Sequence, residues 1–463
     1  MPSRILLKNI GTLMTDPKKE YQSGVDVLIE ENTVKKIQRD IEVTRGTRVI
    51  DCSSCVVIPG MVNTHHHFYQ TLTRNLPEVQ NAKLFDWLVY LYEVWKGIDD
   101  ESVYYSTLTA CAELLKSGCT TTTDHHYLYP RDFSGDPMAV QFEAADMLGI
   151  RFSPTRGSMS LSKKDGGLPP DSVVQDVDTI LKHSEDCIKK YHDPSPMAMH
   201  KVALAPCSPF SVTKECMIQT SRLARKYKVR LHTHLCETMD EENDCLNMYG
   251  VRPVELMQQC ELIGSDVFYA HGIWFNDEEL EILRKSGCHI AHCPSSNMRL
   301  GSGICRTKEM IDKGINVGLA VDGSASNDSS NMLLEARTAL YLARIKYGSC
   351  GLTARDVFKM ACENGANMLG FEKVGRIEEG WAADIAIFDV SKDIDYSGAQ
   401  SDKVAALLFC TPKNAKYTIV NGKLAVDSYR LVGFDEEYLV KKQNECAQRL
   451  YKKSRNITEV FCD

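Results

Sequence analysis

The stretch "CAELLKSGCTTTTDHH", residues 111–126, joins a helix to a strand and sets the fold class. Cys111, Leu114 and Leu115 recur at the spacing of one helical face, and Gly118 is a typical helix-ending residue. The β-branched run that follows is typical of a strand buried on both faces, as in a parallel sheet. Polar residues stand where this strand ends.

The same order recurs along the chain: an amphipathic helix, a glycine or basic residue that ends it, and then a short strand. It is found again in "ADMLGIRFSPTRG", "RLARKYKVRLHTHLCE", "EILRKSGCHIAHCP" and "MIDKGINVGLAVDG". Alternation of helices and strands over roughly 300 residues predicts a parallel α/β domain. The alternation alone fits both a closed eightfold barrel and an open, doubly wound sheet.

The placement of polar residues favours the barrel. They stand at the carboxyl ends of the predicted strands and comprise His65, His67, Asp124 to His126, Arg156, His232 to Glu237, His271, His292 and Asp322. A barrel gathers such strand ends around one mouth, whereas an open sheet leaves the first and last far apart. The glycine-rich phosphate loops typical of open sheets are missing from the sequence. We therefore predict an α/β fold with a (β/α)8 TIM-type catalytic barrel over residues 59–373.

Both ends of the chain carry a different pattern. Residues 1–58 and 374–426 alternate short strands with turns, and Asn421-Gly422 is a strong hairpin signal. We expect these two pieces to form one composite β-sandwich beside the barrel. Residues 427–463 are predicted to be a C-terminal helical extension.

The composition of the 463 residues is that of an ordinary globular protein, with 43% hydrophobic and 25% charged residues. The formal net charge is −8 and there is no basic stripe, which argues against nucleic acid as a partner. The first residues lack the apolar core of a signal peptide, and no apolar run has the length of a membrane helix. The 18 scattered cysteines are best interpreted as reduced thiols, so we expect a cytoplasmic protein with no membrane partner.

The histidines at the predicted barrel mouth have the composition of a metal site. His65 and His67 lie on one side of the first barrel strand, because side chains alternate along a strand. His232 and His234 repeat this pattern on a middle strand, and Asp322 follows a late strand. A histidine-rich site with one carboxylate suits zinc or iron. Each piece alone also fits a buried, hydrogen-bonded histidine or an aspartate in a turn, but their meeting at one mouth favours the metal.

Acid–base groups are predicted at the same mouth. Glu237 lies three residues after His234, beyond the strand end, and His271 follows the apolar run "DVFYA" at the top of the next strand. A hydrogen bond to a neighbouring loop is the plainer interpretation of His271. Hydrolysis by a metal-activated water needs a base for the water and an acid for the leaving group. Asp322 and Glu237 fit these two tasks.

Five motifs, in this order, resemble the amidohydrolase superfamily and, within it, the chlorohydrolase and nucleobase deaminase branch: "PGMVNTHHH", "HTHLCET", "YAHG", "HCPSSNMRLGSG" and "VDGSASND". The resemblance covers essentially the whole chain. It implies one divalent metal ion, usually zinc, with iron as the alternative, whose ligands are His65, His67, His234 and Asp322. It also implies that Glu237 moves a proton to the substrate ring, that His271 holds the attacking water, and that Asp322 takes the proton of that water.

One metal ion is expected rather than two. Dinuclear relatives carry a carboxylated lysine at the end of the fourth barrel strand, whereas Lys201 begins the corresponding strand here. A superfamily member that has become a non-enzymatic scaffold generally loses metal ligands. All four candidates are present, so we predict an enzyme.

The branch removes amino, chloro or alkylamino groups from aromatic nitrogen heterocycles. The resemblance implies that Gln70 contacts a purine edge, that Arg156 faces a carbonyl or anionic ring, and that Trp87 walls the pocket. Alternatively, Gln70 caps a loop, Arg156 pairs with a structural carboxylate, and Trp87 only packs its helix against the core. Cys207 stands where adenosine-type members usually carry a histidine, which favours a free base over a nucleoside.

Within the branch, the motifs look most like the 8-oxoguanine deaminases. This implies hydrolytic deamination (aminohydrolase action on a cyclic amidine) of 8-oxoguanine to uric acid and ammonia. Guanine, isoxanthopterin-like pterins and hydroxylated s-triazines are the alternative substrates. The resemblance also implies that the protein is a homo-oligomer. The binding partner that it implies is a small heterocyclic substrate.

Overall fold

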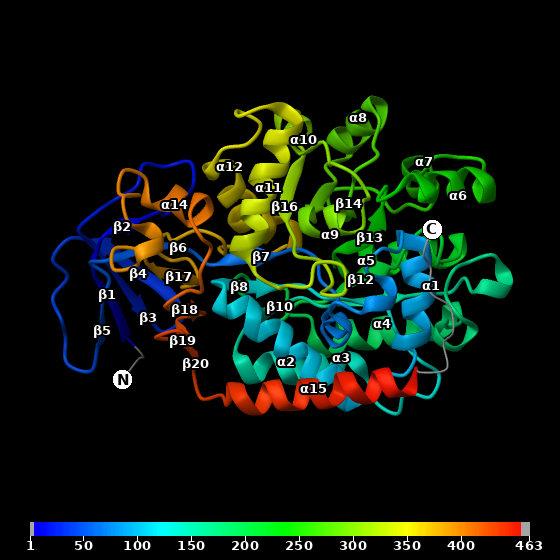
Figure 1. Cartoon of the computed structure of the whole chain (residues 1–463), viewed down its shortest axis with the longest axis horizontal. Helices are drawn as coiled ribbons and strands as arrows, with labels where there is room; N and C mark the ends of the chain where they lie inside the picture. The colour runs from blue at the N-terminus through cyan, green and yellow to red at the C-terminus, as the bar shows by residue number, and fades with distance from the viewer. Residues whose placement is uncertain (1–3, 455–463) are drawn as a thin grey trace.

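The computed structural model describes residues 4–454, and parallel strands run through its centre (Figure 1). These strands are β7 (Met61–Asn63), β8 (Cys119–Thr122), β9 (His125–His126), β10 (Arg151–Phe152), β11 (Thr155–Ser158), β12 (Ala203–Pro206), β13 (Leu231–Leu235), β14 (Val267–His271), β15 (His289–His292) and β16 (Asn316–Leu319). They form a seven-stranded sheet, β16-β15-β14-β13-β12-β11-β9, and a three-stranded sheet, β10-β8-β7. Every strand pair in both sheets is parallel.

Helices alternate with the parallel strands and cover them (Figure 1). They are α1 (Leu84–Trp95), α2 (Asp100–Lys116), α3 (Pro137–Leu148), α4 (Val177–Tyr191), α5 (Lys214–Tyr227), α6 (Met239–Tyr249), α7 (Pro253–Gln259), α8 (Asp277–Ser286), α9 (Pro294–Arg299), α10 (Thr307–Asp312), α11 (Met332–Tyr347), α12 (Ala354–Lys359) and α13 (Gly365–Leu369). Each of the five helix–stop–strand stretches in the sequence contains a helix followed by a strand. The predicted parallel α/β organisation is therefore confirmed.

Local chemistry fixes where the helices end and the strands begin. The Asp99 carboxylate caps α2 by accepting the backbone N–H of Ser102 at 3.0 Å. Gly118 follows this helix with a φ of +90°, a conformation that favours glycine. Asn276 and Glu279 form a capping box at the start of α8.

The first and last parallel strands lie side by side although they belong to different sheets. The Thr64 N–H donates to the Leu319 carbonyl at 3.1 Å, and the Asp322 N–H donates to the His65 carbonyl at 3.1 Å. At the other side, β8 continues along the chain into β9, the edge strand of the larger sheet. The strand ends that carry His65 and Asp322 are therefore adjacent.

Both ends of the chain contribute to a β-rich part beside the parallel strands (Figure 1). Its strands are β1 (Arg4–Ile10), β2 (Thr12–Leu13), β3 (Val25–Glu30), β4 (Thr33–Gln38), β5 (Arg48–Asp51), β6 (Cys55–Pro59), β17 (Ile385–Asp389), β18 (Tyr417–Val420), β19 (Lys423–Asp427) and β20 (Arg430–Leu431). They form two sheets, β4-β3-β1-β5 and β2-β6-β17-β18-β19-β20. Antiparallel pairing of β6 with β17 joins the two chain ends in one sheet.

One hydrophobic cluster joins the two sheets of this part. It contains Leu7 and Val27 of the first sheet and Val57 and Ile387 of the second. The predicted hairpin at Asn421-Gly422 is confirmed, because β18 and β19 pair antiparallel around it and both turn residues have positive φ. The short helix α14 (Lys403–Phe409), which the strand pattern did not predict, lies between β17 and β18.

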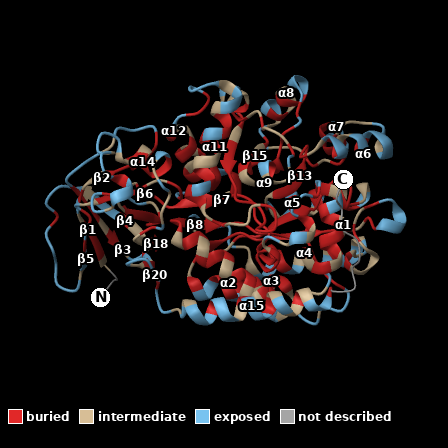
Figure 2. Ribbon diagram, viewed as in Figure 1, coloured by how far each residue is buried: buried red, intermediate tan, exposed pale blue. Residues whose placement is uncertain are grey.

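The C-terminal helix α15 (Glu436–Lys453) runs along α2, with its outer face exposed and its inner face buried (Figure 2). Lys116 of α2 pairs with Glu436 at 2.6 Å. Gln443 Nε2 donates to Thr71 Oγ1 at 3.0 Å, in the 3₁₀ turn η1 (Phe68–Thr73) that follows the first parallel strand. Residues 455–463 of the predicted C-terminal extension lie outside the described part of the chain.

Within residues 4–454, none of the helices combines the length and the apolar character required to cross a membrane. The 17 described cysteines form no disulfide with one another, and all but Cys350 and Cys410 are buried. Cys52 and Cys55, which have the spacing of a redox motif, are both buried.

Candidate metal centre and active site

Side chains from the ends of four parallel strands meet at the centre of the fold. His65 and His67 follow β7, His234 lies in β13, His271 ends β14, and Asp322 follows β16. All five are buried. His271 and Asp322 have left-handed backbone conformations, with φ of +73° and +63°, a strain that non-glycine residues commonly carry at functional sites.

A chain of hydrogen bonds fixes the protonation state of His65. Burial lowers the pKa of this ring and that of His232, so both are neutral. The Phe268 carbonyl can only accept, so His232 Nδ1 carries a proton and donates it at 2.9 Å. His232 Nε2 is then an acceptor, and His65 Nδ1 donates to it at 2.7 Å. His65 Nε2 is left without a proton and without a hydrogen-bond partner among the described residues.

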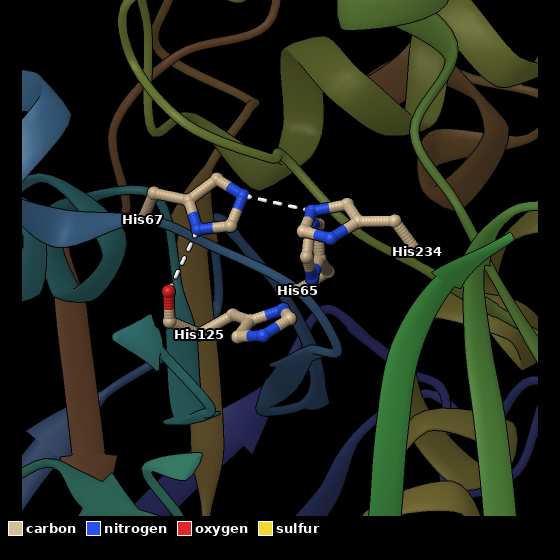
Figure 3. Close-up of side chains that lie close together, drawn as sticks. All are labelled: His65, His67, His125 and His234. Carbon is tan, nitrogen blue, oxygen red and sulfur yellow. Dashed lines mark hydrogen bonds between the residues drawn. The ribbon is translucent and has the colours of Figure 1, made fainter. Parts of the chain in front are cut away.

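Backbone carbonyls fix His67 and His234 in the same way. His67 Nδ1 donates to the His125 carbonyl at 2.8 Å, and His234 Nδ1 donates to the Cys207 carbonyl at 2.7 Å. Both Nε2 atoms are therefore unprotonated in the neutral rings, and they face each other at 3.1 Å (Figure 3). Two bare lone pairs at this distance repel each other unless a cation lies between them.

The arrangement fits a divalent metal ion. Asp322 Oδ1 lies 3.3 Å from His65 Nε2 and 3.4 Å from His67 Nε2. Four ligands placed tetrahedrally about 2.05 Å from a zinc ion stand about 3.3 Å from one another. The separations found here match that spacing, and the bare imidazole nitrogens are the protonation state that a metal requires.

Glu237 and His271 form an acid–base pair beside this cluster. His271 Nε2 lies 3.4 Å from Glu237 Oε2 and 3.8 Å from Asp322 Oδ2. Burial raises the pKa of Glu237 to about 7, so its carboxyl group can hold or release a proton near neutral pH. Burial lowers the pKa of His271, but the Glu237 and Asp322 carboxylates outweigh it, and the net pKa is raised. His271 Nδ1 bonds to Asn297 Oδ1 at 2.9 Å, which directs Nε2 to the carboxylates.

A second glutamate holds the backbone that carries Glu237. The Glu241 carboxylate accepts the backbone N–H groups of Cys236 at 2.7 Å and of Glu237 at 2.9 Å. Cys236 has a φ of +54°, so this turn is strained and needs such support. Glu241 therefore positions Glu237 without facing the cavity itself.

A narrow cavity opens onto the cluster. Its lining includes the metal-site residues His67, His234 and Asp322, the acid–base residues Glu237 and His271, and three predicted substrate contacts, Gln70, Trp87 and Cys207. Gln70 Oε1 is a buried acceptor without a partner among the described residues. A methyl group on Gly323 would lie 1.9 Å from this oxygen, so the glycine makes room for the amide.

A sequence profile of the Amidohydrolase family matches residues 56–425, which include every residue of this site. The chain belongs to the amidohydrolase family. The family match, together with its deaminase relatives, shows that this protein is a hydrolase that acts on C–N bonds.

Known relatives extend the similarity beyond the family profile. This amidohydrolase is 47% identical over 400 residues to 8-oxoguanine deaminase of Pseudomonas aeruginosa, covering 86% of this chain and 88% of the relative. It is 34% identical over 447 residues to hydroxydechloroatrazine ethylaminohydrolase of Pseudomonas sp. (strain ADP), covering 92% of each. Its structure is similar to that of atrazine chlorohydrolase TrzN from Arthrobacter aurescens TC1 complexed with zinc, with 29% identity and a TM-score of 0.91 over 96% of this chain and 100% of that one.

The structure does not bring Arg156 of this amidohydrolase to the cavity. Its guanidinium lies 4.0 Å from the centre of the Tyr129 ring. It donates to His183 Nδ1 at 3.1 Å, to Gln175 Oε1 at 2.6 Å and to the Gly157 carbonyl at 2.7 Å. These contacts come from α4, from β11 itself and from the loops that carry Tyr129 and Gln175, and they leave the predicted substrate contact of Arg156 without structural support.

Sequence reasoning gave no role to several residues of the site. His125 lies in the histidine cluster, and Leu84, Leu88, Tyr92 and Tyr127 line the cavity. The signal for His125 was its place in "TTTTDHH", at a strand end. Leu84, Leu88 and Tyr92 share a helical face with Trp87 in α1, but helical spacing does not distinguish a cavity wall from the core.

Proposed function

We propose that this amidohydrolase deaminates 8-oxoguanine, consuming water and releasing uric acid and ammonia. The observation that carries the proposal is the 47% identity to an 8-oxoguanine deaminase over 86% of the chain. The cavity supports it, because the orphaned acceptor Gln70 Oε1 suits an N–H on a purine edge. The cysteine at position 207, which supplies no strong donor for a ribose, supports a free base as substrate.

The proposed cofactor is one divalent metal ion, with zinc preferred over iron. Its ligands would be His65, His67, His234 and Asp322. When bound, such an ion lowers the pKa of water towards neutrality and so supplies hydroxide for hydrolysis. One ion rather than two is supported by Lys201, which precedes β12 and donates to the Asp193 carbonyl at 3.3 Å instead of standing at the carboxyl end of the strand.

The chain's own residues move the protons. In the proposed reaction, Asp322 Oδ2 takes a proton from the attacking water, and the oxygen adds to the ring carbon that bears the exocyclic amine. Glu237, whose pKa is about 7, donates a proton to the adjacent ring nitrogen. His271 Nε2, which lies between these two carboxylates, holds the attacking oxygen. Asp322 then returns its proton to the amine, which leaves as ammonia, and the proton of the added hydroxyl passes to Glu237 as the carbonyl of uric acid forms.

We also infer that the two parallel sheets form one closed (β/α)8 barrel over residues 59–373. The hydrogen bonds from Thr64 to Leu319 and from Asp322 to His65 support closure between the first and last strands. The shared hydrophobic cluster supports a composite β-sandwich from residues 1–58 and 374–426. The cytoplasmic location and the homo-oligomeric state remain predictions from the sequence.

Turnover of free 8-oxoguanine by the zinc-loaded protein tests the proposed function. Uric acid and ammonia are measured together, with guanine, isoxanthopterin and a hydroxylated s-triazine as parallel substrates. We expect fast conversion of 8-oxoguanine with one ammonia released for each uric acid. The identity to hydroxydechloroatrazine ethylaminohydrolase makes the triazine the main competitor. Turnover of the triazine or pterin alone would reject 8-oxoguanine and keep the hydrolytic chemistry.

A further inference from the structure

The loop after α9 contains a buried serine, Ser302, to which the proposed reaction gives no task. Ser302 belongs to "HCPSSNMRLGSG", one of the five motifs of the sequence. It is 5% exposed and does not line the cavity. Its hydroxyl group reaches the acid–base pair, because Ser302 Oγ donates to Glu237 Oε1 at 3.4 Å. Any effect of Ser302 on the reaction therefore passes through Glu237 rather than through a contact with the substrate.

The contact with Ser302 distinguishes the two oxygens of the Glu237 carboxyl group. Oε1 accepts the hydroxyl proton of Ser302, whereas Oε2 lies 3.4 Å from His271 Nε2. A protonated carboxyl group carries its proton on one oxygen, and the other oxygen can only accept. Because Oε1 is the acceptor, the proton lies on Oε2, on the side of His271 and the reacting atoms. Hydrogen bonds of catalytic groups commonly shorten once the substrate is bound.

Hydrogen bonds fix the backbone of Ser302 on both sides. Its N–H donates to the Asn297 carbonyl at 2.8 Å, and Trp274 Nε1 donates to its carbonyl at 2.9 Å. Asn297 Oδ1 also bonds to His271 Nδ1 at 2.9 Å, so one residue holds both groups that face the Glu237 carboxyl group. A hydroxyl group anchored in this way can keep a catalytic side chain in one orientation.

The two glycines beside Ser302 make this close approach possible. Gly301 has a φ of +66° and Gly303 a φ of +131°, conformations that residues with a side chain rarely adopt. A methyl group on Gly303 would lie 3.0 Å from Ile273 Cγ2 and 3.3 Å from the Trp274 ring. The sequence Gly-Ser-Gly therefore forms a tight loop that brings one hydroxyl group to Glu237.

We propose that Ser302 positions the Glu237 carboxyl group for donation of a proton to the substrate ring. The inference rests on the proposed function and adds to it a residue outside the cavity. Removal of the Ser302 hydroxyl group leaves Glu237 Oε1 without a hydrogen-bond partner among the described residues. The carboxyl group can then rotate, and its proton lies less often on the oxygen that faces the ring. Because Ser302 does not line the cavity, its loss slows the reaction without weakening substrate binding.

A double-mutant cycle in the zinc-loaded, full-length protein tests the proposal. It combines Ser302→Ala with Glu237→Gln and uses whichever of 8-oxoguanine, guanine, isoxanthopterin and the hydroxylated s-triazine the wild-type protein hydrolyses fastest. We expect Ser302→Ala to lower kcat about 10- to 100-fold and to change KM less than about threefold. In the Glu237→Gln background the same substitution should change kcat less than about twofold, because the acid is already absent.

The matched control is Ser221→Ala. Ser221 is also buried, and its hydroxyl group donates to the Met217 carbonyl at 2.8 Å within α5, away from the acid–base pair. Its loss removes the same atom from the interior of the protein but no contact with Glu237. We expect kcat of Ser221→Ala to stay within about twofold of wild type, since the reacting groups are untouched.

Crystal structures of the zinc-loaded wild type and of Ser302→Ala give a second readout that needs no turnover. We expect the Glu237 carboxyl group to turn away from His271 in the variant. An unchanged carboxyl orientation, an unchanged kcat, or a loss of kcat that is equal in both backgrounds would overturn the inference. If 8-oxoguanine is not hydrolysed, the cycle is measured on another heterocycle, so failure of the proposed substrate is distinguishable from failure of the role of Ser302.

Discussion

Replacing His232 with leucine isolates the effect of one hydrogen bond on the metal centre. His232 is not a proposed ligand. It accepts the proton of His65 Nδ1 at 2.7 Å and donates to the Phe268 carbonyl at 2.9 Å. Its ring also stacks on Phe268 with centroids 4.0 Å apart, and leucine keeps an apolar side chain at that contact. The main loss is therefore the acceptor that fixes His65.

The size of the effect follows from two separate costs. In the metal-free protein, the His65 Nδ1–H becomes a buried donor without a partner, which lowers the free energy of unfolding by about 1–3 kcal/mol. In the metal-bound protein, His65 loses the contact that orients its Nε2, and such losses weaken metal binding about 10- to 100-fold. This corresponds to about 1.4–2.7 kcal/mol of binding free energy. His232→Gln supplies an amide oxygen as acceptor, so it should recover part of the lost stability and part of the lost zinc affinity.

Chelator competition measures the zinc Kd of each variant, and urea unfolding of the metal-free proteins measures stability. The control is His292→Leu, because His292 is equally buried at the end of β15 and none of the described hydrogen bonds joins it to His65, His67 or His234. A zinc Kd of His232→Leu within twofold of wild type would refute the reasoning. So would equal losses of zinc affinity in His232→Leu and His292→Leu.

Further predictions concern the acid–base groups, the pocket and a buried carboxyl group. Glu237→Gln and Asp322→Asn should each lower kcat about 10²- to 10⁴-fold in metal-replete protein with unchanged circular dichroism, and a near-normal kcat would reject the assigned role. Gly323→Ala places a methyl group 1.9 Å from Gln70 Oε1, so the amide must move. The KM for 8-oxoguanine should therefore rise by a larger factor than kcat falls. An unchanged KM would argue against contact between Gln70 and the substrate. Burial raises the pKa of Glu335 to about 8 in the folded protein, against a usual value of 4.5, so the folded state holds an extra proton between these values. The free energy of unfolding should therefore fall as pH rises through this window, by up to about 1.4 kcal/mol per pH unit. Glu335→Gln should flatten that slope in urea titrations of the metal-free protein, and equal slopes in both proteins would contradict the assignment.

The alternation of side chains along strands explains how much of the site was predictable. His65 and His67 are two residues apart, so the pattern places them on one side, and the structure brings them together with His234 and Asp322. His66, between them, instead bonds to Ser330 at 2.9 Å. The parallel α/β organisation was predictable for a similar reason, because helical spacing and helix-ending residues recur along the sequence.

The residues that sequence reasoning missed lie where a local pattern breaks. Thr123 and Asp124 interrupt the strand between β8 and β9, so counting faces along the threonine run does not place His125. The Asp124 carboxylate accepts the Phe68 N–H at 2.6 Å and has a structural task of its own. Arg156 shows the opposite failure, because its partners His183 and Gln175 come from α4 and from the loop before it, and the sequence does not reveal that these segments pack against Arg156. Periodicity describes one element at a time, whereas these positions depend on how several elements meet.

The contact between α15 and the turn η1 sets an order of events during protein synthesis. Thr71 lies one residue after Gln70, whose amide faces the cavity, and its hydroxyl receives a hydrogen bond from Gln443, 372 residues further along the chain. The proposed metal ligands span only positions 65 to 322, so a growing chain carries all of them well before it carries the support for Gln70. Strand β6 pairs with β17, so the sheet that contains β6 is likewise completed only after β17 has been synthesised. The newly made protein therefore acquires the residues for binding metal first, and gains a fixed wall for its substrate only after nearly the whole chain has left the ribosome.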